Sequence, residues 1–196
     1  MIFIVRHGQT ELNKRNLLQG RSDYPLNDIG MRQAEDAASW FKEKGIVFDR
    51  VYSSPLKRAL QTAEILTGGR APVIADERLL EMDYGKYEGI GLGSIPPELT
   101  AFFHDFAGTP APETMEQLSE VVARLGSFLE ERKEELSCGN VLISTHAIAM
   151  KGALEYLTPD SKGSYWARFI GNCSVFSFTV ENGRYSVPEE IYCEKD

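Results

Sequence analysis

The stretch that decides the fold is Met1–Thr10, with the sequence MIFIVRHGQT. Residues Ile2–Val5 form an apolar run rich in β-branched types, which is typical of a short buried strand. Arg6, His7 and Gly8 follow this run at once. A glycine lets the backbone approach a ligand closely, while the arginine and the histidine offer a positive charge and a nucleophile. The stretch therefore predicts a strand that ends in a reactive site, with a plain polar turn as the simpler alternative.

The composition of the 196-residue chain limits the kinds of partner it can have. Its 21 Lys and Arg against 29 Asp and Glu give a net charge of −8, which argues against nucleic acid or an anionic membrane as a partner. With 42% hydrophobic residues the chain is expected to be soluble and globular, with one large core. No apolar run approaches the ~18 residues of a membrane span, and MIFIV lacks the length and the basic region of a signal peptide. We therefore expect a cytoplasmic protein.

The cysteines and histidines give no sign of a disulfide framework or a metal site. Cys138, Cys173 and Cys193 are odd in number and show no CxxC spacing, so we interpret them as reduced structural thiols. The three histidines show neither HxH nor HExxH spacing. No metal and no cofactor are therefore expected.

Alternating strand and helix patterns extend along the rest of the chain. Further strands are predicted at Val47–Tyr52, Pro72–Ala75 and Val141–Thr145, with a terminal hairpin of Ser174–Val180 and Tyr185–Val187 across Asn182-Gly183. Helices are predicted from Asn27 or Asp28 to Gly45, from Ser54-Pro55 to Leu66, from Thr114 to Leu129, and from His146 to a point before Pro159. This alternation shows no repeat and no linker, and so predicts a single domain over residues 1–196. The expected fold is α/β, a three-layer sandwich in which helices flank a mainly parallel sheet.

Side-chain patterns set the expected ends and buried faces of these helices. Ser54 is expected to cap the second helix with Pro55 at its first position, and Thr114 with Gln117 forms a capping-box pattern. The first helix is expected to bury Met31, Ala34, Ala38 and Phe41, the second Leu56, Leu60, Ala63 and Leu66, and the third Met115, Leu118, Val122, Leu125 and Leu129. The longest of these stripes is attributed to core packing alone.

Three predicted strands end in residues that can bind an anion. Arg6 and His7 follow the first strand, Arg58 lies in the first turn of the helix after the second, and His146 directly follows the fourth. Ligands bind beyond the carboxyl ends of the strands in such sheets, so these groups together predict a phosphate site. Asn13 can add a hydrogen bond to it. Taken singly, Arg58 also fits an ion pair with a helix carboxylate, and His146 a hydrogen-bonded core histidine.

Four motifs along the chain resemble those of a known family. They are Arg6-His7-Gly8-Gln9-Thr10 with Asn13, Ser54-Pro55 with Arg58 and Thr62-Ala63, Glu81-Met82-Asp83-Tyr84-Gly85 with Glu88-Gly89, and Ser144-Thr145-His146. In this order they resemble the histidine phosphatase superfamily, also called phosphoglycerate-mutase-like, and they span nearly the whole chain. The string from Glu81 to Gly89 is more similar to α-ribazole phosphatases and broad-specificity phosphatases than to mutases. Gln19-Gly20-Arg21-Ser22-Asp23 resembles the family's pocket-lining segment, although a plain polar loop explains it nearly as well.

The resemblance implies a mechanism for the site. His7 attacks the phosphorus and forms a phosphohistidine, which water then hydrolyses, while Glu81 gives a proton to the leaving oxygen. Asp83 shares a side with Glu81 in an extended segment, so the motif rather than geometry assigns the acid. The implied phosphate ligands are Arg6, Asn13, Arg58 and His146, and the implied substrate pocket is lined by Thr10, Gln19, Gly20 and Arg21. No metal is needed where these side chains supply the positive charge. Neighbouring arginines are expected to lower the pKa of His7, which must be neutral to attack.

Residues 88–113, which we expect to form a lid over the site, separate two possible reactions. They carry Phe102, Phe103 and Phe106, and residues 90–113 contain acidic side chains but no Lys or Arg. Mutases that resemble this protein carry a lysine and an arginine pair there for a second phosphate, which acidic residues would repel. The sequence therefore favours a phosphatase acting on small phosphate monoesters. A cofactor-dependent phosphoglycerate mutase and a non-catalytic phosphoprotein-binding module remain the alternatives, and the oligomeric state stays open, with a homodimer among the options.

Overall fold

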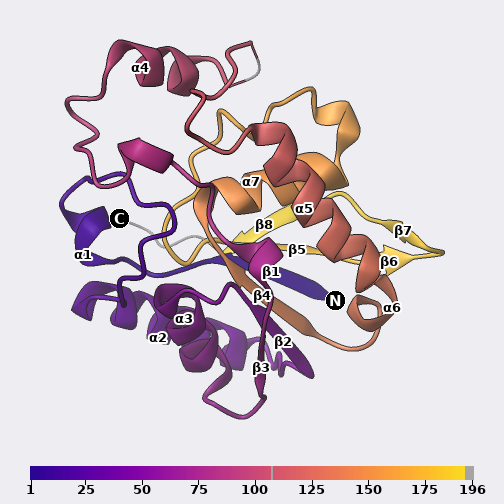
Figure 1. The fold of residues 1–196 in the computed structure, drawn as a ribbon. Coiled ribbons are helices and arrows are strands. Elements are labelled where there is room, and N and C mark those ends of the chain that lie inside the picture. The colour runs from indigo at the N-terminus through magenta and orange to yellow at the C-terminus, as the bar shows by residue number, and fades with distance from the viewer. Residues whose placement is uncertain (107, 193–196) are drawn as a thin grey trace.

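The core of the fold is a single mainly parallel sheet. In the computed structural model, which describes residues 1–106 and 108–192, six strands pair in the order β3-β2-β4-β1-β5-β8 (Figure 1). These strands are β1 (Ile2–Arg6), β2 (Arg50–Ser53), β3 (Val73–Ala75), β4 (Val141–Thr145), β5 (Val175–Phe178) and β8 (Glu189–Tyr192). The pairs from β3 to β1 are parallel, and only β5 and β8 run antiparallel to their neighbours. The predicted sheet type is confirmed.

The opening apolar run forms an inner strand of this sheet. β1 is buried along its apolar length and pairs with β4 on one edge and β5 on the other. Its side chains alternate between the two faces, as strand geometry requires. Ile2 and Ile4 belong to one core cluster and Phe3 and Val5 to the other. The register pairs Arg6 with Thr145, so the residues that follow each strand emerge side by side.

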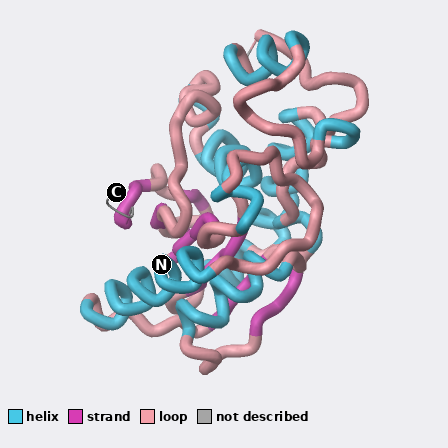
Figure 2. The backbone as a smooth tube through the Cα atoms, turned by 90° about the vertical axis from the view of Figure 1, so that its left-hand side faces the viewer, coloured by secondary structure: helices cyan, strands magenta, loops and turns pink. Residues whose placement is uncertain are grey.

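Helices cover both faces and give the predicted three layers. α2 (Asp28–Glu43) and α3 (Lys57–Thr67) share a core cluster with Phe3 and Val5, while α5 (Leu118–Glu131) and α7 (Ala147–Leu157) pack with Ile2 and Ile4. Short elements complete the chain, namely α1 (Glu11–Lys14), α4 (Pro97–His104), α6 (Lys133–Leu136), β6 (Val180–Glu181), β7 (Arg184–Tyr185), and the 3-10 turns η1 (Glu77–Leu79), η2 (Gly85–Tyr87) and η3 (Pro159–Ser161). Figures 1 and 2 show α4 at the end of the molecule farthest from α2.

The start of α3 differs from the prediction. The helix begins at Lys57, with Leu56 in the cap position and no side-chain cap, rather than at Ser54-Pro55. Ser54 is engaged elsewhere, because its Oγ lies 2.8 Å from Nε2 of His146. The buried side of α3 includes Arg58 instead of Leu60, which is only partly buried. Ser54 therefore does not cap α3, because its hydroxyl is bound to His146 instead.

The start of α5 also differs. The helix begins at Leu118 and not after Thr114, and its capping box joins Gln117 with Glu120. The residues before it run along the acidic motif, where the Glu116 amide donates to the Asp83 carbonyl at 2.9 Å. That pairing keeps 114–116 out of the helix. Met115 is buried as expected, but outside the helix.

The buried face of α2 is rotated from the predicted one. Met31 is 39% exposed, and the buried residues are Gly30, Gln33, Ala34, Ala37 and Phe41. The cause is Gly30, whose backbone lies so close to the chain at Gln9 that a Cβ there would be 2.1 Å from the Gln9 carbonyl oxygen. The predicted helix ends are correct: Asn27 caps the start, and Gly45 follows the end with a φ of +67°.

The predicted hairpin is correct at its turn and incomplete in its strands. β6 and β7 pair across Asn182-Gly183, whose φ angles of +52° and +74° are those of a tight hairpin turn. The strand expected over Ser174–Val180 is split at Thr179 into β5 and β6. β8, which pairs with β5, had no counterpart in the sequence prediction.

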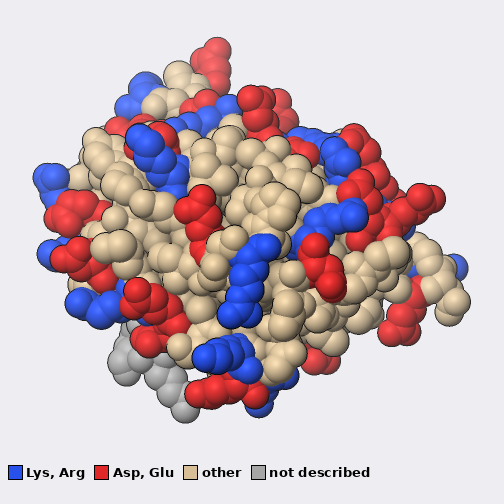
Figure 3. Space-filling model, turned by 90° about the horizontal axis from the view of Figure 1, so that it is seen from below, with Lys and Arg blue, Asp and Glu red and all other residues tan. Residues whose placement is uncertain are grey.

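The surface and the cysteines add little to the functional argument. Within residues 1–106 and 108–192, no helix combines the length and the apolar character that crossing a membrane requires. Basic and acidic side chains are interspersed on the face shown in Figure 3. Cys173 is buried, as expected of a structural thiol, whereas Cys138 is exposed and Cys193 lies outside the described residues.

Candidate active site

His7 follows β1 and is held with one ring nitrogen available. Its amide donates to the Thr145 carbonyl at 2.9 Å, and its side chain is 4% exposed. Nδ1 lies 2.7 Å from the Gly8 carbonyl oxygen. Since a carbonyl can only accept, Nδ1 carries the proton, and Nε2 presents a lone pair. Gly8 has to be glycine, because a Cβ there would lie 2.4 Å from the Gly30 carbonyl oxygen.

Arg58 joins the two histidines. Its fully buried guanidinium donates through Nε to His7 Nε2 at 3.2 Å and to His146 Nδ1 at 3.1 Å. Nη1 and Nη2 donate to the carbonyl oxygens of Ser22 and Gly20, at 2.8 and 2.6 Å. Within the described chain Arg58 forms no ion pair, so the alternative of a helix carboxylate partner is wrong. The positive charge of Arg58 lies instead beside His7 and His146, at the ends of β1 and β4.

His146 completes the pair of imidazoles. It follows β4, is fully buried, and lies with its ring centre 5.1 Å from that of His7. Because Nδ1 accepts from Arg58, Nε2 carries the proton and donates to Ser54 Oγ at 2.8 Å. His146 is thus a hydrogen-bonded core histidine that lies beside His7 and Arg58.

Both histidines are held in the neutral form. Burial lowers the pKa of His7 well below its usual value, and the charges of Arg58 and Arg6 lower it further. Burial, Arg58 and His7 act on His146 in the same direction. The predicted direction for His7 is confirmed, but burial rather than the arginines is the larger cause. A neutral imidazole is the form that can act as a nucleophile.

Arg6 keeps one buried donor without a partner. Its Nη1 donates to the Ile170 carbonyl at 2.5 Å, while Nε has no hydrogen-bond partner among the described residues. Burial lowers the pKa of Arg6. A buried N–H of this kind is costly unless a ligand oxygen meets it, which is consistent with the implied phosphate contact.

Glu81 lies at the start of the helix that His146 begins. Its buried carboxylate accepts from the amides of Ala149 (3.0 Å) and Ile148 (3.2 Å), in the first turn of α7, and from that of Met82 (2.9 Å). The other candidate acid, Asp83, is 44% exposed and pairs with Arg21 at 3.7 Å. The structure therefore binds Glu81, rather than Asp83, to the helix that follows His146.

The first loop is ordered by its own polar residues. Asn13 and Thr10 cap α1 reciprocally, since the Thr10 amide donates to Asn13 Oδ1 at 3.1 Å and the Asn13 amide to Thr10 Oγ1 at 3.3 Å. Thr10 Oγ1 also donates to Gln19 Oε1 at 2.6 Å. The Gln19 Nε2 group is buried without a partner among the described residues, so it is a second free donor near the site.

Glu88 is a residue whose part the sequence prediction missed. Its carboxylate accepts from three consecutive amides, those of Gly20, Arg21 and Ser22, at 2.8 to 3.0 Å. Arg58 binds carbonyls of the same loop, so the loop is fixed from both sides. The presence of Glu88-Gly89 in the acidic motif was the signal in the sequence that could have pointed to this role.

Arg21, predicted to line the substrate pocket, has carboxylate partners instead. Its half-exposed guanidinium pairs with Asp83 at 3.7 Å and Glu116 at 3.5 Å. It links the first loop to the acidic motif. Among residues 1–106 and 108–192, no group of three or more His, Cys, Asp or Glu is arranged to hold a metal ion.

Comparison with known proteins agrees with this geometry. The sequence profile of the histidine phosphatase superfamily (branch 1) matches residues 2–189, and the chain belongs to this superfamily. It is 32% identical to the uncharacterized phosphatase PhoE of Bacillus subtilis, over 93% of this chain and 91% of that protein. It is 34% identical to a 2,3-bisphosphoglycerate-dependent phosphoglycerate mutase of Cytophaga hutchinsonii, over 80% of this chain and 76% of that protein.

A solved structure points the same way. Phosphoserine phosphatase of Entamoeba histolytica, in complex with 3-phosphoglyceric acid, superposes with a TM-score of 0.84 at 25% identity, over 98% of this chain and 97% of that one. The phosphatase names among these proteins support a phosphatase within the superfamily, and the predicted resemblance is confirmed.

Proposed function

We propose that this protein hydrolyses small phosphate monoesters without a metal, through a phosphohistidine formed on His7. One observation carries the proposal: the lone pair of His7 Nε2 lies 3.2 Å from Nε of the buried Arg58. A neutral nucleophile therefore faces a fixed positive charge, in a place where a phosphoryl group would bring negative oxygens.

The reaction divides into two displacements. In the first, a bond forms between His7 Nε2 and phosphorus, the bond from phosphorus to the ester oxygen breaks, and Glu81 gives its proton to the leaving alkoxide. The positive charge that develops on the ring is stabilised by the Nδ1–H bond to the Gly8 carbonyl. In the second, Glu81 removes a proton from water, whose oxygen attacks phosphorus and releases inorganic phosphate and free His7.

The remaining polar groups offset the charge of the phosphoryl oxygens. Arg6 and Arg58 supply two guanidinium groups, and His146 holds the Arg58 side chain by accepting a hydrogen bond from its Nε. Asn13 and the free amide of Gln19 offer further donors at the first loop. Donors aligned before the reaction stabilise the transition state without reorganisation, which is why side chains can replace a metal here.

Release of phosphate, rather than its transfer to a second substrate, is supported by residues 90–113. They contain no Lys or Arg to hold a second phosphate. Around α4 they carry an aromatic cluster, with Phe102 and Phe106 ring centres 4.9 Å apart. A mutase is the second candidate, because a relative of comparable identity bears that name.

Trapping of the phosphoenzyme tests the proposal. The parent is mixed with an excess of ³²P-labelled phosphate monoester and quenched in alkali, in which phosphohistidine survives. His7→Ala should carry no label and no activity, while His104→Ala, at an exposed position on α4, should match the parent. Label on His7→Ala contradicts the proposal. Loss of activity in EDTA contradicts metal independence, and steady interconversion of phosphoglycerates in place of phosphate release favours the mutase.

A further inference from the structure

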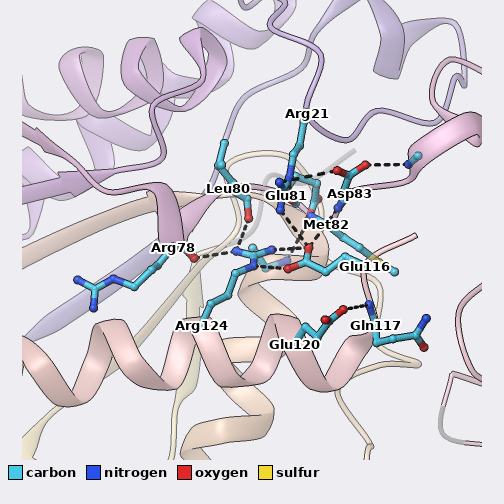
Figure 4. A network of polar contacts seen from close by, with 12 residues as sticks. Arg21, Arg78, Leu80, Glu81, Met82, Asp83, Glu116, Gln117, Glu120 and Arg124 are labelled. Carbon is cyan, nitrogen blue, oxygen red and sulfur yellow. Dashed lines mark hydrogen bonds and ion pairs between the residues drawn. The ribbon is translucent and has the colours of Figure 1, made fainter. Parts of the chain in front are cut away.

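The segment that carries Glu81 has no regular secondary structure of its own. Residues 80–84 lie between η1 and η2, outside any helix or strand. The Glu81 carboxylate is bound to the start of α7, but the backbone on either side needs other partners. Figure 4 shows that these partners come from α5 and from the residue that precedes its cap.

Arg124 binds the backbone before Glu81. From α5 its Nη1 donates to the carbonyl oxygens of Arg78 at 2.7 Å and Leu80 at 2.6 Å. Nε and Nη2 donate to the two carboxylate oxygens of Glu116, at 2.7 and 3.1 Å. This fork-to-fork contact leaves the guanidinium one orientation, in which it holds both carbonyls.

Glu116 binds the backbone after Glu81. Its Oε2 accepts from the Asp83 amide at 3.1 Å, and its own amide donates to the Asp83 carbonyl at 2.9 Å. Arg21 adds a weaker contact to the same carboxylate at 3.5 Å. The peptide groups on both sides of Glu81 are thus tied to a single buried ion pair, whose side chains are 15% and 10% exposed.

Packing of α5 does not require this pair. The helix is docked through Val121, Leu125 and Phe128, which are all fully buried. Arg124 lies beside that apolar face, and every contact of its guanidinium recorded for the described chain goes to Glu116 or to the backbone of residues 78–80. The guanidinium of Arg124 therefore binds the segment that carries Glu81 and is not needed to pack α5.

We propose that Arg124 and Glu116 are positioning residues, which set where the Glu81 carboxyl group stands relative to the leaving oxygen. The inference rests on the proposed role of Glu81 as the proton donor. Proton transfer requires the donor within hydrogen-bond reach, and a displacement of about 1 Å can cost on the order of 100-fold in rate. In the first displacement, which kcat/KM reports, only substrates whose leaving group needs a proton should feel that loss.

The test compares two substrates. Glycerol phosphate releases a strongly basic alkoxide that needs the proton, whereas p-nitrophenyl phosphate releases a weakly basic phenolate. Arg124→Met should lower kcat/KM for glycerol phosphate roughly 10- to 100-fold and for p-nitrophenyl phosphate by no more than about 3-fold. Glu116→Gln should show the same selectivity. Arg124→Lys, which can reach the carbonyls but cannot form the bidentate contact, should recover part of the loss.

Matched controls separate positioning from folding. Arg132→Met removes an arginine at the end of α5 whose partners are Glu131 and Glu135, and it should leave the ratio of the two rates unchanged. Equal losses on both substrates in Arg124→Met and Glu116→Gln would reveal a merely structural role and overturn the proposal. If Arg124→Met does not fold, the rates of Arg124→Lys and Glu116→Gln decide.

Glu81→Gln tells this proposal apart from the proposed function. If Glu81→Gln loses kcat/KM equally on both substrates, Glu81 is not the acid, and the proposed function fails with the present inference. If Glu81→Gln is selective and Arg124→Met is not, only the positioning role is wrong. The double variant of Glu81→Gln with Arg124→Met should lose no more activity on glycerol phosphate than Glu81→Gln alone, because Arg124 and Glu116 act through Glu81.

Discussion

The proposed nucleophile and the proposed acid of this site are held by two different kinds of structure. His7 and His146 stand at the ends of adjacent parallel strands, and their spacing follows from the register that pairs Arg6 with Thr145. Glu81 stands on an irregular segment whose place is set by the Arg124 side chain of α5 and by backbone amides at the start of α7. The first position cannot move without breaking the central sheet, while the second depends on a single buried ion pair that one mutation can remove. Nucleophilic attack and proton transfer should therefore respond differently to mutation.

The largest effect is expected on the nucleophile side, at Arg58. Arg58→Met removes the buried charge beside His7 and the donors that hold the loop at Gly20 and Ser22. Loss of a preorganised donor costs about 10²–10³ in rate, so kcat/KM should fall by roughly 10³ on both an alkyl and an aryl phosphate. Steady-state kinetics measure this, with Lys57→Met, at the exposed neighbouring position, as the control. A loss confined to one substrate would contradict the division between the two sides.

The next largest effects are expected from alanine substitutions at two tightly packed glycines, Gly8 beside His7 and Gly85 in the acidic motif. In Gly8→Ala the new Cβ would lie 2.4 Å from the Gly30 carbonyl oxygen, and in Gly85→Ala 1.9 Å from the Thr114 carbonyl oxygen, at a φ of +52°. Each should destabilise the fold by about 2–4 kcal/mol, from overpacking and, at Gly85, from backbone strain. Denaturant unfolding measures the loss.

The two glycine variants should differ in substrate selectivity. Gly8→Ala displaces the nucleophile and should slow all substrates alike, while Gly85→Ala displaces the acidic motif and should slow alkyl phosphates more than aryl ones. Gly91→Ala, where an added Cβ meets nothing within 4 Å, is the control for both. Equal selectivity in the two variants would show that both sides move as one body.

The smallest effect is a pH dependence of stability that belongs to the nucleophile side. The pKa of His7 and that of His146 are lowered in the folded chain, so between those values and about 6.5 the unfolded chain binds more protons. The free energy of unfolding should therefore fall as pH drops below about 6.5. His146→Asn should halve this dependence, and His104→Ala, at an exposed position, should leave it unchanged. A slope insensitive to His146→Asn would contradict the assignment.

The sequence was informative where one local pattern decides the structure. The opening run predicted one buried strand, and the apolar run before His146 predicted another, because a buried strand needs only its own residues to be recognised. Their meeting at one sheet edge followed from the α/β pattern, and the structure brings His7, Arg58 and His146 together there.

The sequence was least informative where a distant partner decides. Met31 appeared to belong to the buried stripe, but the close approach of Gly30 to Gln9 turned the helix. The start of α5 shifted because Glu116 pairs with Asp83, which lies 33 residues away along the chain. No periodicity within either segment records such a contact, so the support of Glu81 became visible only in three dimensions.

The place of β1 in the sheet has a consequence for how the chain folds. This strand is synthesised first, yet both of its partners, β4 and β5, lie beyond residue 140. At about 5–20 residues per second, its apolar side chains and open edges wait roughly 7–30 s for those partners on the ribosome. The reactive end of the strand is equally incomplete during that time. The candidate site is therefore complete only when β4 and β5 have paired with β1.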